Sequence, residues 1–71
     1  MKKYQFFIPC QSEGETLLIL HYNTNSLEEI INDIKTKREK FPKLDLKTDR
    51  LCHLIRNGKP EDIWLSEFIN D

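Results

Sequence analysis

The sequence has few cysteines, no long apolar run and no excess of either charge, and each shortage excludes a class of protein. Cys10 and Cys52 are too few for a disulfide framework, so we expect two small buried thiols. The longest apolar run, residues 17–20, is far shorter than the roughly 20 residues that cross a membrane. The formal net charge of −1 gives no overall attraction to nucleic acid or to an anionic membrane.

The N-terminus lacks the features of a secretory signal, because Pro9 and the polar residues after it interrupt its short apolar run. We therefore expect a cytoplasmic protein with no membrane partner. The 71 residues form at most one domain, residues 1–71. A chain this short buries only about 60 % of the surface that its unfolded form exposes, so a partner chain, a metal or disulfides often stabilise such domains.

Apart from carboxylates, the reactive side chains are His21, His53, Cys10 and Cys52. Cys52 and His53 are adjacent, and adjacent side chains diverge on a strand and on a helix alike, which disfavours a zinc site. In the hairpin expected below, His21 lies roughly 17 Å from Cys10 at about 3.4 Å per residue, too far for a hydrogen bond. The sequence has no Gly-rich phosphate loop and no Gly-x-Ser-x-Gly or His-Glu-x-x-His motif. We therefore expect a non-enzyme with no catalytic residues, no metal site and no cofactor.

Residues 26–40, SLEEIINDIKTKREK, predict an amphipathic helix around which the domain is organised. One apolar stripe at helical spacing is formed by Leu27, Ile30, Ile31 and Ile34. Ser26 stands at the N-cap position, and Glu29 follows three residues later as in a capping box. Acidic residues come early and basic residues late, which suits the helix dipole. Pro42 ends the helix, because the residue before a proline avoids the α region.

Two strands at residues 3–8 and 16–22 predict an N-terminal antiparallel hairpin. Gln11 to Glu15 form a polar turn in which Gly14 supplies a positive φ, and Cys10 then faces Thr16. The second strand is continuously apolar over residues 17–20, which suggests burial on both faces. One helix covers one face only, so the cover for the other face is either the C-terminal segment or a second copy of the chain.

The C-terminal third allows two interpretations. Residues 43–47 alternate weakly, as in a short third strand, and residues 49–57 form a helix if Thr48 is its N-cap. Pro60, with two acidic residues after it, then begins a last helix whose apolar face falls within residues 63–69. The alternative is a hairpin, because Asn57-Gly58 is a strong type I′ turn signal. We favour the helices, since Pro60 fits poorly within a strand ladder.

The order of strand, Gly-containing turn, strand, capped helix and proline is similar to that of ubiquitin-like β-grasp domains. The nearest matches are Leu-Ile-x-x-Gly-Lys at residues 54–59 and Leu-Ser-x-aromatic at residues 65–68. The sequence ends before the strand that would complete a β-grasp sheet and has no terminal Gly-Gly, so we expect no conjugation function.

Charge is distributed unevenly along the chain. Residues 35–50 contain seven basic and three acidic residues, whereas residues 60–71 contain four acidic residues and no basic one. A basic patch of this kind binds nucleic acid or an acidic protein surface. The alternative is a solvated helix end that complements its own dipole and faces an acidic tail within the fold. Aromatic side chains are also numerous for this length, and Trp64 and Phe68 either anchor an interface or pack the last helix.

These patterns predict a small single-domain α+β fold, in which an N-terminal antiparallel β-hairpin packs on an amphipathic helix and two short C-terminal helices complete the core. The function that we expect is stoichiometric inhibition or modulation of a larger protein or complex, of the anti-defence, host-takeover or antitoxin kind, by steric or electrostatic occlusion. The candidate binding residues are Lys35, Lys37, Arg38, Lys40, Lys43, Arg50, Arg56, Trp64 and Phe68. Two alternatives are a nucleic-acid-binding regulator that uses the basic 35–56 region and a self-associating subunit, such as a homodimer, that pairs through residues 17–20.

Overall fold

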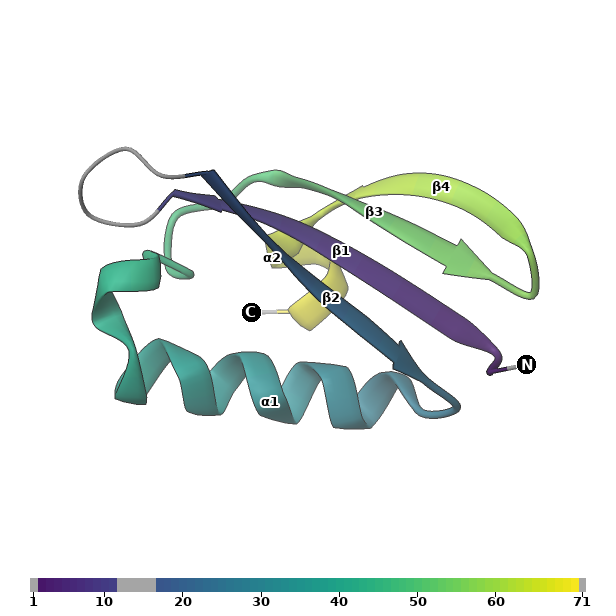
Figure 1. The fold of residues 1–71 in the computed structure, drawn as a ribbon, viewed down its shortest axis with the longest axis horizontal. Coiled ribbons are helices and arrows are strands. Elements are labelled where there is room, and N and C mark those ends of the chain that lie inside the picture. The colour runs from purple at the N-terminus through teal and green to yellow at the C-terminus, as the bar shows by residue number, and fades with distance from the viewer. Residues whose placement is uncertain (1, 12–16, 71) are drawn as a thin grey trace.

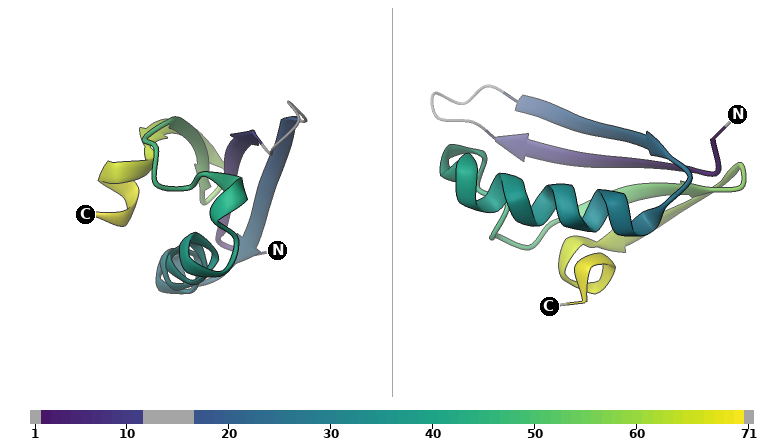
Figure 2. Two further views of the ribbon diagram at one scale, coloured as in Figure 1. Left: turned by 90° about the vertical axis from the view of Figure 1, so that its left-hand side faces the viewer. Right: turned by 90° about the horizontal axis from the view of Figure 1, so that it is seen from below.

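The computed structural model describes residues 2–11 and 17–70 and shows an α+β domain (Figure 1). Its elements are, in chain order, β1 (Tyr4–Gln11), β2 (Leu17–Thr24), α1 (Leu27–Lys40), the short 3₁₀ helix η1 (Pro42–Leu44), β3 (Leu51–Arg56), β4 (Lys59–Trp64) and α2 (Leu65–Ile69). The four strands form one antiparallel sheet in the order β2-β1-β3-β4. Both α-helices lie on the same side of this curved sheet (Figure 2).

The N-terminal hairpin is confirmed, with a register two residues away from the one expected. Cys10 pairs with Leu18, and Phe7 pairs with His21. The shift is an even number of residues, so every side chain keeps the face that the sequence predicts. The expected turn around Gly14 lies outside the described residues, apart from Gln11, which belongs to β1.

The central helix has the predicted bounds and caps. The Ser26 hydroxyl accepts a hydrogen bond from the Glu29 backbone N–H at 3.4 Å, as an N-cap does. The Glu29 carboxylate does not complete the capping box but accepts a hydrogen bond of 2.5 Å from the Thr24 hydroxyl. The helix ends at Lys40, directly before Phe41 and Pro42. These contacts fix the start of α1 against the end of β2.

The preference for helices after residue 50 is wrong, and the hairpin alternative is right. β3 and β4 pair from Leu51 opposite Trp64 to Arg56 opposite Lys59. Asn57 and Gly58 have φ values of 51° and 80°, so both central residues of the turn are left-handed, as type I′ requires. The local turn signal therefore prevails over the helical spacing.

Pro60 does not disrupt the sheet because β4 is an edge strand. The Leu65 N–H donates to the Arg50 carbonyl oxygen at 2.8 Å, which continues the β3–β4 ladder. Hydrogen-bonded pairs alternate along an antiparallel ladder, so Pro60, opposite Ile55, stands in a non-hydrogen-bonded pair. Its backbone nitrogen faces outward from the edge, where a missing N–H costs nothing.

Two further expectations are corrected between α1 and the C-terminus. Residues 43–47 do not form a strand: η1 begins at Pro42, and Leu46 enters the core with 1 % of its surface exposed. The last helix begins at Leu65 and not at Pro60, because residues 59–64 belong to β4. Asp49, which is distant from this short helix in the sequence, caps its first turn. The Asp49 carboxylate accepts hydrogen bonds from the N–H and the hydroxyl of Ser66 at 2.9 and 2.8 Å.

The core lies between the sheet and the two helices. Its buried residues come from every layer and are Phe6, Ile8, Cys10, Ile30, Ile34, Leu46, Cys52, Leu54, Leu65, Phe68 and Ile69. The Phe6 and Phe68 rings stack with their centroids 4.0 Å apart, which holds α2 against the middle of β1. Ile30 and Ile34 are the fully buried members of the predicted stripe on α1.

The similarity to β-grasp domains extends only to the order of the elements. β1 pairs directly with β3, and the described residues supply no fifth strand to the sheet. Within the described ranges, no helix is long and apolar enough to cross a membrane.

Candidate binding surface

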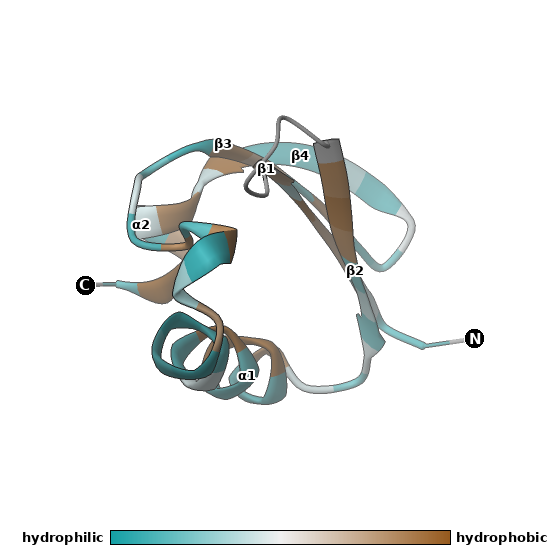
Figure 3. Cartoon of the chain, turned by 60° about the vertical axis from the view of Figure 1, so that its left-hand side comes forward, coloured by the Kyte–Doolittle hydropathy of each residue, from teal (hydrophilic) through white to brown (hydrophobic). Residues whose placement is uncertain are grey.

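The two faces of the sheet differ in cover. The face toward α1 and α2, here called the inner face, carries the buried side chains of β1 and β3. Side chains alternate along a strand, so the intervening residues project from the opposite side, here called the outer face. Figures 2 and 3 show that no described helix covers this side. The outer-face residues are Gln5, Phe7, Pro9, Ile19, His21, Asn23, Leu51, His53, Ile55, Pro60, Asp62 and Trp64.

The middle of the outer face is a row of aromatic rings across three strands. Phe7 stacks almost parallel on His21, with centroids 4.4 Å apart and an angle of 5°. His53 lies on the other side of Phe7, with a centroid distance of 6.1 Å and a tilt of 49°. The register places all three side by side, because Phe7 pairs with His21 in β2 and with His53 in β3.

Each imidazole of this row also has a polar neighbour. His21 Nε2 lies 3.3 Å from Gln5 Oε1, and His53 Nδ1 lies 2.9 Å from Asp62 Oδ1. The side chains of His53 and Asp62 are 46 % and 64 % exposed, so water reaches both groups. These contacts orient the rings without burying them.

A second row, two residues along the strands, is apolar. Pro9 pairs with Ile19, and Leu51 pairs with Trp64. Ile19 is 68 % exposed, and Leu51 and Trp64 are each 47 % exposed. Large apolar side chains that are grouped and exposed in this way are typical of interaction sites.

Charge is almost absent from the outer face. None of its twelve residues is Lys or Arg, and Asp62 is its only carboxylate. The basic side chains that the sequence singles out lie elsewhere, on α1, on η1, in the segment before β3 and, for Arg56, at an inner-face position at the end of β3. The fold therefore separates a surface with a single carboxylate and no Lys or Arg from a surface rich in charged side chains.

Most of the predicted basic residues take part in contacts within the fold. Lys37 forms an ion pair with Asp33 and lies 5.6 Å from the centre of the Tyr22 ring. Arg38 donates to the Leu46 carbonyl oxygen at 3.0 Å. Arg56 lies 3.7 Å from a Glu61 carboxylate oxygen across the β3–β4 pair. Exposed positions on α1 and η1 are held by Lys35, Lys40 and Lys43.

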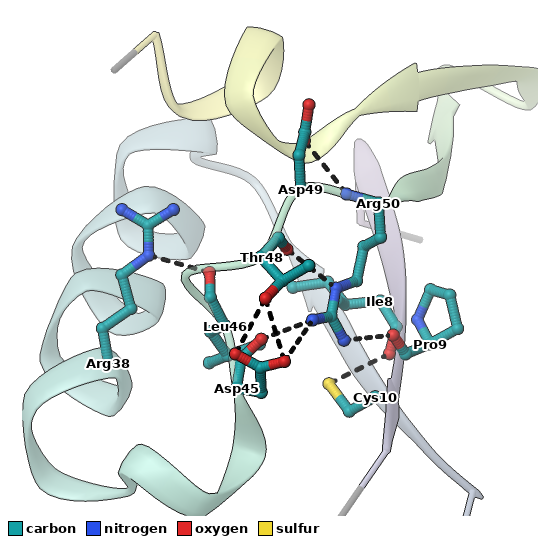
Figure 4. A network of polar contacts seen from close by, with 9 residues as sticks. All are labelled: Ile8, Pro9, Cys10, Arg38, Asp45, Leu46, Thr48, Asp49 and Arg50. Atoms are coloured by element: carbon teal, nitrogen blue, oxygen red, sulfur yellow. Dashed lines mark hydrogen bonds and ion pairs between the residues drawn. The ribbon is translucent and has the colours of Figure 1, made fainter.

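Arg50 makes the largest set of these contacts (Figure 4). Its guanidinium donates to the Pro9 carbonyl oxygen at 2.9 Å and also to the Asp45 carbonyl oxygen. Its Nε donates to the Thr48 carbonyl oxygen at 3.2 Å, and the Asp45 carboxylate lies 3.8 Å away. Only 17 % of the Arg50 side chain is exposed, so most of its surface is covered by contacts within the domain.

The two predicted aromatic anchors are separated. Trp64 is on the outer face, in the apolar row. Phe68 is only 9 % exposed and stacks on Phe6, so it packs α2 as the second interpretation of the sequence had it. The other outer-face residues were missed because the helix assigned to residues 49–57 removed β3 from the sheet. The Asn57-Gly58 turn signal would have placed Leu51 beside Trp64 and His53 beside Asp62, whereas the pairing of His53 with Phe7 depends on the tertiary pairing of β1 with β3.

The sheet also keeps the reactive side chains apart. Cys10 and Cys52 are buried on the inner face, whereas both histidines are on the outer face. Burial raises the pKa of the Cys10 thiol, and burial raises that of Cys52 to about 11. Among the described residues no group of three or more His, Cys, Asp or Glu side chains is arranged to hold a metal ion.

One polar groove of about 330 Å³ lies between β2 and α1. Its lining residues are Lys2, Tyr22, Asn23, Thr24, Glu29, Ile30 and Asp33. The Tyr22 hydroxyl donates a hydrogen bond to the Asp33 carboxylate at 2.7 Å. The pKa of Tyr22 is raised, mainly by burial and also by this hydrogen bond. The pKa of Asp33 is lowered by its hydrogen bonds from Lys37 and Tyr22. The carboxylates of this groove therefore already have partners within the fold.

Comparison of the chain with models of protein families, with curated proteins and with solved structures gave no match.

Proposed function

We propose that the protein is a non-catalytic binding module that docks on a larger protein through its outer face and inhibits or modulates that protein by occlusion. The observation that carries this proposal is the apolar row of Ile19, Pro9, Leu51 and Trp64 beside the stacked rings of Phe7 and the histidines, on a side of the sheet that no described helix covers. Exposed apolar and aromatic groups of this kind form the centres of protein interfaces.

The charge distribution favours a protein over a nucleic acid as the partner. Binding of nucleic acid depends on Lys and Arg contacts to phosphates, alongside any stacking of bases on aromatic rings. The outer face offers rings but, among its twelve residues, no Lys or Arg. Arg50 and Arg38, the two arginines of the basic segment, donate to backbone carbonyl oxygens of the domain itself.

The separation of the reactive groups supports a role in binding rather than in catalysis. A Cys–His pair needs hydrogen-bond contact, and here the thiols and imidazoles are on opposite faces of the sheet. A raised thiol pKa also reduces the fraction of nucleophilic thiolate at neutral pH. We therefore propose that steric cover of a partner's surface is the mechanism.

Quantitative capture of the partner tests this proposal with a matched pair of variants. The tagged chain is incubated with an extract of the cells that produce it, and retained proteins are quantified for the wild type, L51A/W64A and K35A/K40A. Truncating two central interface side chains costs at least about 1 kcal/mol each, so we expect L51A/W64A to bind a defined protein more than about tenfold less tightly. The K35A/K40A variant should retain it.

The two variants distinguish the steric from the electrostatic version. Both pairs of side chains are exposed, so both variants should fold, which circular dichroism can verify. Equal capture by L51A/W64A and the wild type would disprove docking through the outer face. Loss of capture only with K35A/K40A, and only at low salt, would assign binding to the basic end of α1.

A further inference from the structure

The sheet has two edges, and only one of them is protected. β4 carries Lys59, Pro60, Glu61 and Asp62, and charged residues and proline are the features that natural proteins use to prevent edge-to-edge pairing. The other edge, β2, reads LLILHYNT and contains no Lys, Arg, Asp, Glu, Pro or Gly. Figure 3 shows the same contrast, with β4 largely hydrophilic and the first half of β2 hydrophobic.

The backbone groups that face outward from β2 follow from two hydrogen bonds. The Asn57 N–H donates to the Lys3 carbonyl oxygen at 2.9 Å, in line with the β1–β3 ladder. Bonding alternates along a strand, so the odd-numbered residues of β1 bond to β3 and the even-numbered ones bond to β2. The Leu65-to-Arg50 bond gives the same alternation through β3.

The register of the hairpin then assigns the residues of β2. Even-numbered residues such as Leu18 and Leu20 face Cys10 and Ile8 and bond to β1. The N–H and C=O groups of Ile19, His21 and Asn23 therefore point away from the sheet. Among the described strands, β2 has a neighbour on the β1 side only, so these groups have no strand to pair with.

Apolar side chains are exposed on both faces of this edge. Leu18 points to the inner side and is 41 % exposed, and Ile19 points to the outer side and is 68 % exposed. A neighbouring strand would cover part of both, because cross-strand pairs on each face lie in contact. Within the apolar run that the sequence shows, Leu18 and Ile19 are thus left exposed on opposite sides of the edge strand.

We propose that the strand that completes this edge is β2 of a second copy of the chain, paired antiparallel across a two-fold axis into one eight-stranded sheet. An antiparallel pair of identical strands is self-complementary, as a two-fold interface requires. β2 carries no charge, so no like charges face each other across the axis, whereas two copies of β4 would bring acidic residues together. A domain of this size also belongs to the class that oligomerisation commonly stabilises.

This pairing covers Ile19 in part and leaves the rest of the outer face free. Two outer faces would join along β2 into one continuous surface, while Leu51 and Trp64 lie toward the β4 side of each protomer. Dimerisation and partner docking are therefore separate properties, and either can fail without the other.

Substitution of Ile19 tests the pairing through the backbone. Ile19→Pro removes an outward N–H without breaking a hydrogen bond to β1. Pro60 is the natural parallel, because it lacks an outward N–H in β4 without breaking a hydrogen bond to β3. Ile19→Ala removes the same exposed side chain and keeps the N–H. In sedimentation velocity and light scattering over a concentration series, we expect the wild type and Ile19→Ala to have twice the 8.5 kDa mass of the chain and Ile19→Pro to have that mass once.

A second variant decides the question if Ile19→Pro does not fold. Ile19→Lys keeps the N–H but places two like charges near the axis, so the dimer should dissociate at concentrations where Ile19→Ala stays paired. A wild type that is monomeric at every concentration, a dimer that survives both substitutions, or growth beyond two chains would overturn the proposal. If L51A/W64A still captured the partner and the dimer were intact, the result would contradict docking through the outer face but not dimerisation through β2.

Discussion

Arg50 provides a sharp test of the structure, because sequence patterns assign it to a binding surface, whereas in the fold its guanidinium makes hydrogen bonds within the domain. We predict that Arg50→Ala destabilises the domain and leaves partner capture unchanged for the fraction that remains folded. The guanidinium serves carbonyl oxygens of three separate residues, Pro9, Asp45 and Thr48, and so ties β1 to the segment before β3.

The size of the effect follows from these contacts. Hydrogen bonds from charged groups contribute about 1.5–3 kcal/mol each when buried, but water can replace some of them here. The ion pair to Asp45 adds little, because the Asp45 side chain is 61 % exposed. We therefore expect a loss of about 2–3 kcal/mol, out of roughly 4–10 kcal/mol for a domain of this length. The melting temperature should fall by about 8–24 °C.

The assay is urea unfolding followed by fluorescence of the single tryptophan, Trp64, together with far-UV circular dichroism. Arg50→Lys is the matched control, since it keeps the charge but cannot reach three carbonyl oxygens with one planar group. It should recover less than half of the lost stability. An Arg50→Ala variant that is within about 0.5 kcal/mol of the wild type, and that has lost its partner, would refute the assignment of Arg50 to contacts within the fold.

Two further predictions concern titration and thiol chemistry. Hydrogen bonds from Lys37 and Tyr22 lower the pKa of Asp33, and hydrogen bonds from Ser66 lower the pKa of Asp49. Each carboxylate therefore stabilises the fold fully above the ordinary pKa of about 4. This stabilisation is lost as the pH falls through the lower pKa of the folded state. Urea midpoints measured down to about pH 3 should therefore fall, with Asp33→Asn and Asp49→Asn each showing a shallower fall, and a flat wild-type profile would contradict this. Cys10 and Cys52 should react slowly with a thiol reagent in the native protein and rapidly in urea, because both are buried with raised pKa values. Rapid reaction of either thiol in the native state would show that the inner face is open.

The first half of the fold could be predicted from the sequence because its signals are local and agree with one another. Ser26, the apolar stripe and Pro42 define α1 from both ends, and the alternation from Tyr4 to Ile8 defines the strand that it covers. The register of the hairpin could not be predicted from spacing alone, which placed Cys10 opposite Thr16, whereas Cys10 pairs with Leu18.

The second half could not be predicted with the same rules, because its local signals conflict. Thr48 and the spacing of Leu51, Leu54 and Ile55 fit a helix as well as a strand, and Pro60 disfavours only a central strand. The position of β4 at the edge of the sheet resolves the conflict, and that position is a tertiary property. The binding surface was missed for the same reason, since it needs β1 and β3 side by side.

The basic segment shows a different limit of sequence analysis. Charge counts identify Arg38 and Arg50 as cationic, but they do not show which carbonyl oxygens lie within reach of each guanidinium. The folded path of residues 41–50 brings the carbonyl oxygens of Leu46 and Asp45 within reach of these two side chains (Figure 4). A charge run along the chain therefore overstates the basic surface that a partner meets.

Carbethoxylation of the histidines tests the central claim most directly, because both histidines of the chain lie on the outer face and flank Phe7. The rate of modification of His21 and His53 by diethyl pyrocarbonate is measured by mass spectrometry for the protein alone and in complex with its captured partner, at the same protein concentration. The account predicts that both rates fall sharply in the complex while acetylation of Lys35 and Lys40 is unchanged. Unchanged histidine rates, with protection of these lysines, would contradict docking through the outer face.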